Sequence, residues 1–131
     1  MIASKKKVTK PAEETQTIKL QGFVIWIFIG GDDQGSSLRF EITNAILRGG
    51  GKEIAFDCNC ANHGEDSYIY TVILRREDSI LYRGDWSVND GDRSHGTCSC
   101  RLYSNGPRIA LIGTWYENGG TQQWVAELSP V

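Results

Sequence analysis

The four cysteines of the chain stand in two close pairs, Cys58-x-Cys60 and Cys98-x-Cys100. Residues two apart on a β-strand share a face, so each pair would place both thiols on one side of its strand. Four converging thiolates could hold a metal ion, and pairs that meet could form disulfides. The pairs fall on strands that are not sequence neighbours, and thiols in a reducing cell also serve as small buried apolar side chains. We favour this third interpretation, and we expect no metal and no other cofactor.

Two histidines and one acidic turn are the other residues that could take part in catalysis or metal binding. His63 and His95 lie in segments rich in turn-forming residues, and no Ser or Cys has a spacing that marks a catalytic triad with either. The Asn-Asp-Gly-Asp run at 89–92 carries part of a calcium-loop pattern but lacks its spacing and its terminal Glu. We interpret these residues as solvated loop histidines and a turn.

Eight apolar segments separated by short Gly-, Asn- and Asp-rich connections organise the rest of the chain. Such spacing is typical of an all-β domain whose sequential strands pair as hairpins. Closing the sheet removes its two open edges, so we predict an eight-stranded antiparallel up-and-down meander barrel, with a two-sheet β-sandwich as the alternative. Residues 1–16 are predicted to be a flexible polar tail, and 17–131 a single barrel domain. The predicted strands are 18–29, 38–47, 53–60, 67–75, 80–88, 97–103, 108–116 and 122–128.

Alternation of apolar and polar residues assigns the inner face of five of these strands. The predicted inward residues are Leu38, Phe40, Ile42 and Ile46; Ile54, Phe56, Cys58 and Cys60; Ile80, Tyr82, Trp86 and Val88; Cys98, Cys100 and Leu102; and Trp124, Ala126 and Leu128.

The first strand is apolar on both faces, and one face needs a cover other than the barrel core. A second copy of the chain is the most economical cover, so we predict a homo-oligomer with Phe23, Ile25, Ile27 and Ile29 in its interface. The alternative cover is the N-terminal tail. The segment 68–74 is similarly apolar on both faces.

A meander places alternate connections at opposite barrel ends, which gives this barrel a charge polarity. One end would carry Asp32, Asp33, His63, Glu65, Asp66, Asp90, Asp92, His95 and Glu117, with Arg93 as its cation. The other would carry Arg48, Lys52, Arg75, Arg76 and Arg108, with Glu77, Asp78 and the tail lysines Lys5, Lys6, Lys7 and Lys10. We predict a ligand pocket at the acidic end and leave open a docking surface at the basic end.

The overall charge and the N-terminal sequence limit the partners and the cellular location that we expect. With a net charge of −2 we expect no nucleic-acid partner, and no apolar run is long enough to span a membrane as a helix. Lys5 to Lys7 are not followed by the apolar core of a secretory signal, so we expect a cytoplasmic protein.

A short segment around Gly113-Thr114-Trp115-Tyr116 resembles the Gly-Thr-Trp-Tyr segment of avidin- and streptavidin-like proteins. It is also similar to the Gly-x-Trp signature of lipocalin-type barrels. In both families the segment lies on the first strand, whereas here it falls on the seventh. The resemblance implies an up-and-down barrel that binds a small molecule inside. It places Glu117 where avidin-like proteins have a ligand-contacting Asn, and Thr121 where they have a Ser.

The leading hypothesis is therefore a non-enzymatic, oligomeric barrel that binds a small molecule at its acidic end. Trp86, Trp115 and Trp124 would form the walls, while Glu117 and Thr121 would orient a polar ligand. An interaction or scaffold module with a filled core is one alternative. A small barrel enzyme, an isomerase or hydrolase working at the acidic mouth, is the other.

Overall fold

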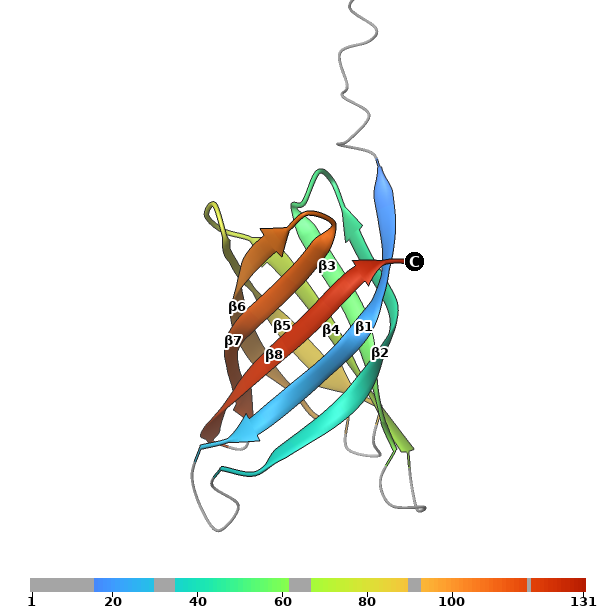
Figure 1. Ribbon diagram of the computed structural model, residues 1–131. Coiled ribbons are helices and arrows are strands. Elements are labelled where there is room, and N and C mark those ends of the chain that lie inside the picture. Colours follow the sequence, from blue (N-terminus) through green and yellow to red (C-terminus); the bar gives the residue numbers. More distant parts are fainter. Residues whose placement is uncertain (1–15, 30–34, 62–66, 90–92, 118) are drawn as a thin grey trace, which may run out of the picture.

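Eight antiparallel strands form one closed barrel in the computed structural model, which describes residues 16–29, 35–61, 67–89, 93–117 and 119–131. Each strand pairs with the next along the chain, and β8 pairs with β1 from Leu20–Pro130 to Phe28–Gln122 (Figure 1). The strands are β1 (Thr17–Phe28), β2 (Ser37–Arg48), β3 (Glu53–Ala61), β4 (Ser67–Arg76), β5 (Leu81–Val88), β6 (His95–Asn105), β7 (Arg108–Glu117) and β8 (Gly120–Pro130). The predicted meander barrel is confirmed, and the sandwich alternative is wrong because β1 and β8 close the sheet.

The barrel interior follows the period-two alternation on most strands. On β3, the inward set of Ile54, Phe56, Cys58 and Cys60 is buried as predicted. The predicted sets on β6 and β8 also face inward, with Leu102 only partly buried. Aromatic rings fill much of this core, and Trp86, Trp115, Trp124 and Phe56 are among its largest fully buried side chains.

A β-bulge at Asn44 makes one predicted inward residue wrong. Asn44 has a φ of +51°, and the β2–β3 register shifts between Thr43 and Ile46. The extra residue reverses the alternation along the end of β2. Ala45, which is 2% exposed, therefore enters the core in place of the predicted Ile46.

A second correction concerns Ile80, which was predicted to face inward. It is 38% exposed, because it belongs to the β4–β5 turn and β5 begins only at Leu81. The other predicted inward residues of this strand, Tyr82, Trp86 and Val88, are buried.

A glycine makes room for one of the core indoles. Trp86 on β5 pairs with Gly96 on β6, and a Cβ atom at Gly96 would lie 2.6 Å from the Trp86 ring. The ring therefore packs directly over the glycine backbone, which no larger residue would allow without a shift.

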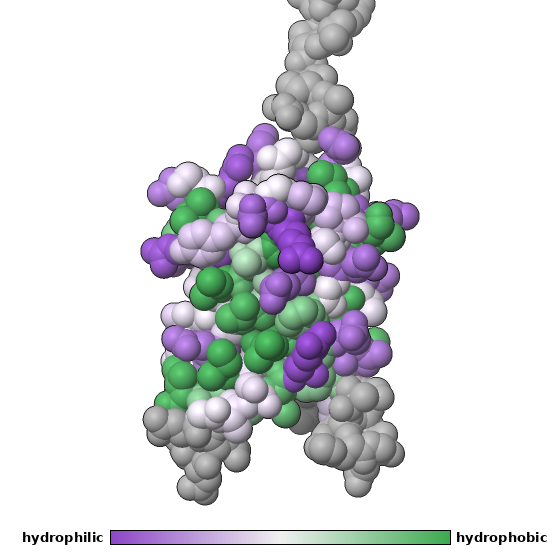
Figure 2. Space-filling view, in the orientation of Figure 1, coloured by the Kyte–Doolittle hydropathy of each residue, from purple (hydrophilic) through white to green (hydrophobic). Residues whose placement is uncertain are grey.

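An apolar row crosses the outer face of three adjacent strands. Ile25 on β1 pairs with Val125 on β8, which pairs with Ile112 on β7. Ile112 is 51% exposed, and Figure 2 shows apolar residues gathered over this face of the barrel. We call these three residues the outer apolar row.

The second strand predicted to be apolar on both faces, β4, presents no comparable row. Two of its outward residues, Ile69 and Ile73, pair with Asn59 and Ala55 on β3. On the other side, Ile73 pairs with Asp85 on β5. Ile69 therefore has a polar neighbour on β3, and Ile73 has the small Ala55 on one side and a carboxylate on the other.

Several charged side chains form ion pairs at the barrel end where β2 joins β3 and β4 joins β5. Glu53 pairs with Arg48 and lies 3.5 Å from Arg75, and Arg83 lies 3.1 Å from Glu77. Most of the predicted acidic residues of the opposite end, Asp32, Asp33, Glu65, Asp66, Asp90 and Asp92, lie outside the described residues, as do His63 and the tail. Within the described part of the chain, no helix is long and apolar enough to cross a bilayer.

Candidate functional site: a pocket at one end of the barrel

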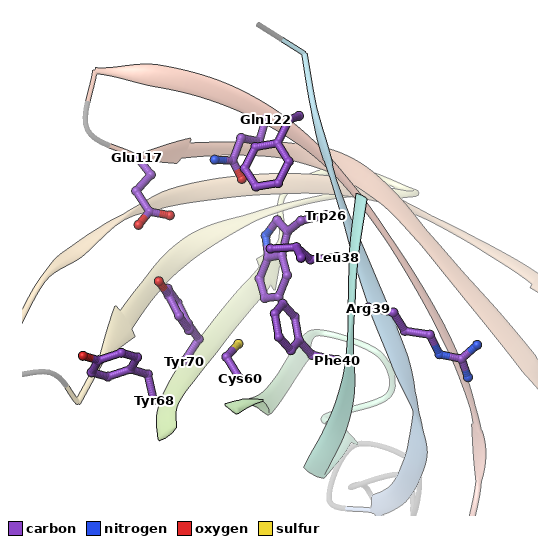
Figure 3. A pocket seen from close by; sticks show the side chains of 10 residues that line it. Trp26, Leu38, Arg39, Phe40, Cys60, Tyr68, Tyr70, Glu117 and Gln122 are labelled. Carbon is purple, nitrogen blue, oxygen red and sulfur yellow. The ribbon is translucent and has the colours of Figure 1, made fainter. Parts of the chain in front are cut away.

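A pocket of about 580 Å³ opens at the barrel end where β1, β3 and β7 end and β2, β4 and β8 begin. We call this the pocket end, and it is the end for which the sequence predicted a pocket. The volume lies in the usual range for small-molecule sites. The pocket is lined by Trp26, Phe28, Leu38, Arg39, Phe40, Cys60, Tyr68, Tyr70, Glu117 and Gln122 (Figure 3).

An aromatic cluster underlies the pocket. Trp26 meets Trp115 edge-on, with ring centroids 5.1 Å apart, and Tyr70 lies 5.8 Å from each of these two rings. Trp115 in turn stacks on Trp86 at 5.1 Å and an interplanar angle of 16°. Trp86, Trp115 and Trp124, predicted as pocket walls, therefore fill the interior beside the pocket, while Trp26 lines it.

Three of the four indole nitrogens have hydrogen-bond partners. Trp86 Nε1 donates to the Tyr116 carbonyl at 2.9 Å, and Trp124 Nε1 donates to the Thr114 carbonyl at 3.1 Å. Trp115 Nε1 donates to Glu117 Oε1 at 2.8 Å. These bonds fix the core rings in single orientations.

The fourth indole, Trp26, is only 5% exposed, and its Nε1 has no hydrogen-bond partner among the described residues. Figure 3 shows this nitrogen on the side of the ring that faces Glu117 and Tyr70. A buried donor without a partner costs about 1–3 kcal/mol. The nitrogen is closed to solvent in this structure, so the pocket contacts the Trp26 ring and not its N–H group.

Glu117 and Gln122 reach the pocket, whereas Thr121 does not. Glu117 is two residues beyond Trp115 on β7, so the two side chains share the inner face. Thr121 is the cross-strand partner of Tyr116, and both are exposed on the outer face. Its neighbour Gln122 faces inward and lines the pocket. Glu117, Trp26 and Gln122 thus line the same pocket, and Thr121 lies outside it.

Arg39 contributes little positive charge to the pocket. Its guanidinium carbon lies 3.9 Å from the centroid of the Phe23 ring, in a cation–π contact on the outer face. Figure 3 shows this side chain turned away from the other lining residues. Glu117 is therefore the charged side chain that points into the pocket from the described residues.

The four cysteines are buried and unbridged, in agreement with their interpretation as small core side chains. Burial raises the pKa of Cys98 and of Cys100 to about 12. Cys60 lines the pocket, and its pKa is raised to about 12 by burial and, secondarily, by the negative charge of Glu117. These thiols are protonated at neutral pH and offer no thiolate nucleophile. The described residues contain no group of three or more potential metal ligands.

Sequence reasoning missed Trp26, Tyr68 and Tyr70 as lining residues. Their strands are apolar on both faces, so the period-two pattern does not select an inner face. Pairing with the patterned strands would have supplied it, because Tyr70 lies opposite Cys58, whose inward direction was predicted.

Comparison of the chain with protein families, curated proteins and solved structures finds no match.

Proposed function

We propose that this protein is a non-enzymatic barrel that binds a small molecule in the pocket. One pocket lined by five aromatic side chains together with Glu117 and Gln122 is the observation that carries the proposal. An aromatic-walled pocket with a few converging polar groups is the usual design of a binding site for a small molecule.

Binding fits the pocket better than catalysis. The thiol of Cys60 is protonated, and His95, the histidine within the described residues, does not line the pocket. The resemblance of the Trp115 segment to avidin-like and lipocalin-type barrels supports the same function. The closed eight-stranded meander is the architecture of those families, although membership in either remains a proposal.

A plug in the pocket tests this proposal. We choose N-phenyl-1-naphthylamine, a neutral dye that fluoresces in apolar sites, as the probe. The variant Gln122→Trp fills the pocket from β8, and Thr121→Trp adds the same side chain to the outer face one residue away. We expect saturable dye binding by the wild type and by Thr121→Trp, and its loss in Gln122→Trp.

A second plug, Leu38→Trp on β2, provides an independent test if Gln122→Trp fails to fold. Far-UV circular dichroism would establish that each variant keeps its β-structure. Dye binding that survives both plugs, or no saturable binding by the wild type, would overturn the proposal.

The outer apolar row supports a second candidate property, self-association. Ile25, Val125 and Ile112 lie in register on three adjacent strands, and Ile27 and Phe23 flank Ile25 on β1. A contiguous apolar surface of this kind is typical of an interface. We propose a homo-oligomer in which two barrels pack through this face, and its test is given below.

A further inference from the structure

We propose that the ligand of the pocket is a protonated organic amine whose ammonium group binds Glu117 and whose carbon skeleton packs against the aromatic lining. This inference rests on the proposed binding function and names the chemical class of the ligand. It differs from the general proposal because it requires a positive charge on the ligand.

The charge of the pocket is the first argument. Glu117 is held toward the inner face by Trp115, and its bond to that indole engages only Oε1. Arg39, the cationic lining residue, has its guanidinium over Phe23 on the outer face. A carboxylate in a partly desolvated site attracts a cation more strongly than it would in water. The described lining therefore favours a positive ligand group and disfavours a carboxylate or phosphate.

The aromatic lining is the second argument. Five aromatic side chains line the pocket together with Glu117, namely Trp26, Phe28, Phe40, Tyr68 and Tyr70. The negative faces of aromatic rings attract ammonium groups, and the attraction grows when the site is desolvated. The rings also provide apolar contact for the carbon skeleton of an amine. An alkali metal ion would leave this apolar surface without a partner.

Three small phenols that differ mainly in charge test the inference by displacing the bound dye. Tyramine is a cation at neutral pH, 4-ethylphenol is neutral, and 3-(4-hydroxyphenyl)propanoate is an anion. We expect tyramine to displace N-phenyl-1-naphthylamine at about tenfold lower concentration than 4-ethylphenol, with the anion weakest.

The variant Glu117→Gln is the matched control, because its amide oxygen can still accept from Trp115 Nε1. We expect it to lose the preference for tyramine while it keeps the affinity for 4-ethylphenol. Displacement by the neutral or anionic phenol that equals that of tyramine would overturn the amine inference and leave the binding function standing. The same holds if Glu117→Gln retains the tyramine preference. If neither plug variant lowers dye binding, the proposed binding function is refuted, and the amine inference falls with it.

Discussion

Trp115 and Glu117, two residues apart on β7, are joined by a 2.8 Å hydrogen bond from the indole Nε1 to the carboxylate Oε1. Trp115 is fully buried and stacks on Trp86, whereas Glu117 lines the pocket. The core of the barrel therefore sets the position of the charged group in the pocket. Residues on one strand face can couple packing to recognition in this way because their side chains project in parallel.

The coupling predicts that Trp115→Phe weakens amine selectivity as well as stability. The phenyl ring keeps part of the apolar packing but cannot hold Glu117 in place. We expect the tyramine preference over 4-ethylphenol to fall several-fold, and the free energy of unfolding to fall by about 1–3 kcal/mol. Trp124→Phe is the control, since it also loses an indole hydrogen bond, to the Thr114 carbonyl, but has none with Glu117. Equal loss of selectivity in both variants would contradict the coupling.

The buried cysteines predict a loss of stability at alkaline pH. Burial raises the pKa of Cys98 and Cys100 from 9.0 to about 12, so the unfolded chain releases these protons at lower pH than the folded chain. Their contribution to stability is complete below pH 9 and is lost as the pH rises toward 12. Between these values each thiol reduces the free energy of unfolding by about 1.4 kcal/mol per pH unit.

Urea unfolding in a reducing buffer at several pH values measures this slope. The double variant Cys98→Ala/Cys100→Ala is expected to be less stable at neutral pH because of the lost side-chain volume. Its stability should nevertheless decline less steeply above pH 9. A slope identical to that of the wild type would show that these thiols do not titrate as the burial predicts.

The bulge at Asn44 predicts a strong preference for small or Asx side chains at that position. The φ of +51° is unfavourable for a β-branched residue, and the Asn44 amide donates to Asp57 Oδ2 at 3.0 Å. We expect Asn44→Val to lower the free energy of unfolding by about 2 kcal/mol and Asn44→Gly by well under half of that. Urea denaturation of both variants tests this, and equal losses would mean that the backbone conformation at the bulge is unimportant.

The outer apolar row predicts that a charge at its centre prevents self-association. Ile25→Glu places a carboxylate between Val125 and Arg39 on the outer face, where burial in an interface would be costly. We expect light scattering coupled to size exclusion to give an oligomer for the wild type and a monomer for Ile25→Glu. Ile69→Glu is the control, because Ile69 is an exposed apolar residue on β4 outside the row. A wild type that is monomeric at high concentration would remove the proposal.

The barrel was predictable because every connection is short and several strands are polar on one face. The short connections therefore predicted which strands pair, and the local alternation predicted the inward residues of β3, β6 and β8. It failed at Ile46, because a single left-handed residue at Asn44 shifts the alternation and leaves no mark in the apolar pattern. It failed at Ile80, because an apolar turn residue next to a strand resembles the strand's first position.

Loop parity predicted which connections share a barrel end, and the pocket in the structure lies at the end of the odd-numbered connections, with a lining that was only partly predicted. Glu117 was chosen from the resemblance to avidin-like proteins, and it does line the pocket. Thr121 was chosen from a family resemblance, whereas the alternation of β8 directs Gln122 inward. The sequence named four tryptophans without showing which of them keeps an unpartnered donor. That property depends on where each ring edge lies relative to the backbone carbonyls of other strands.

The pairing of β1 with β8 has a practical consequence. Thr17 begins β1 and Pro130 ends β8 at the barrel end opposite the pocket, and the Val131 N–H donates to the Lys19 carbonyl at 3.1 Å. A fluorescent reporter or a surface linker attached directly before Thr17 or after Pro130 would thus lie at the barrel end opposite the pocket entrance. The same proximity allows the start of β1 to be joined to the end of β8 and the chain to be reopened at another connection. A barrel immobilised in this way would keep its pocket entrance exposed.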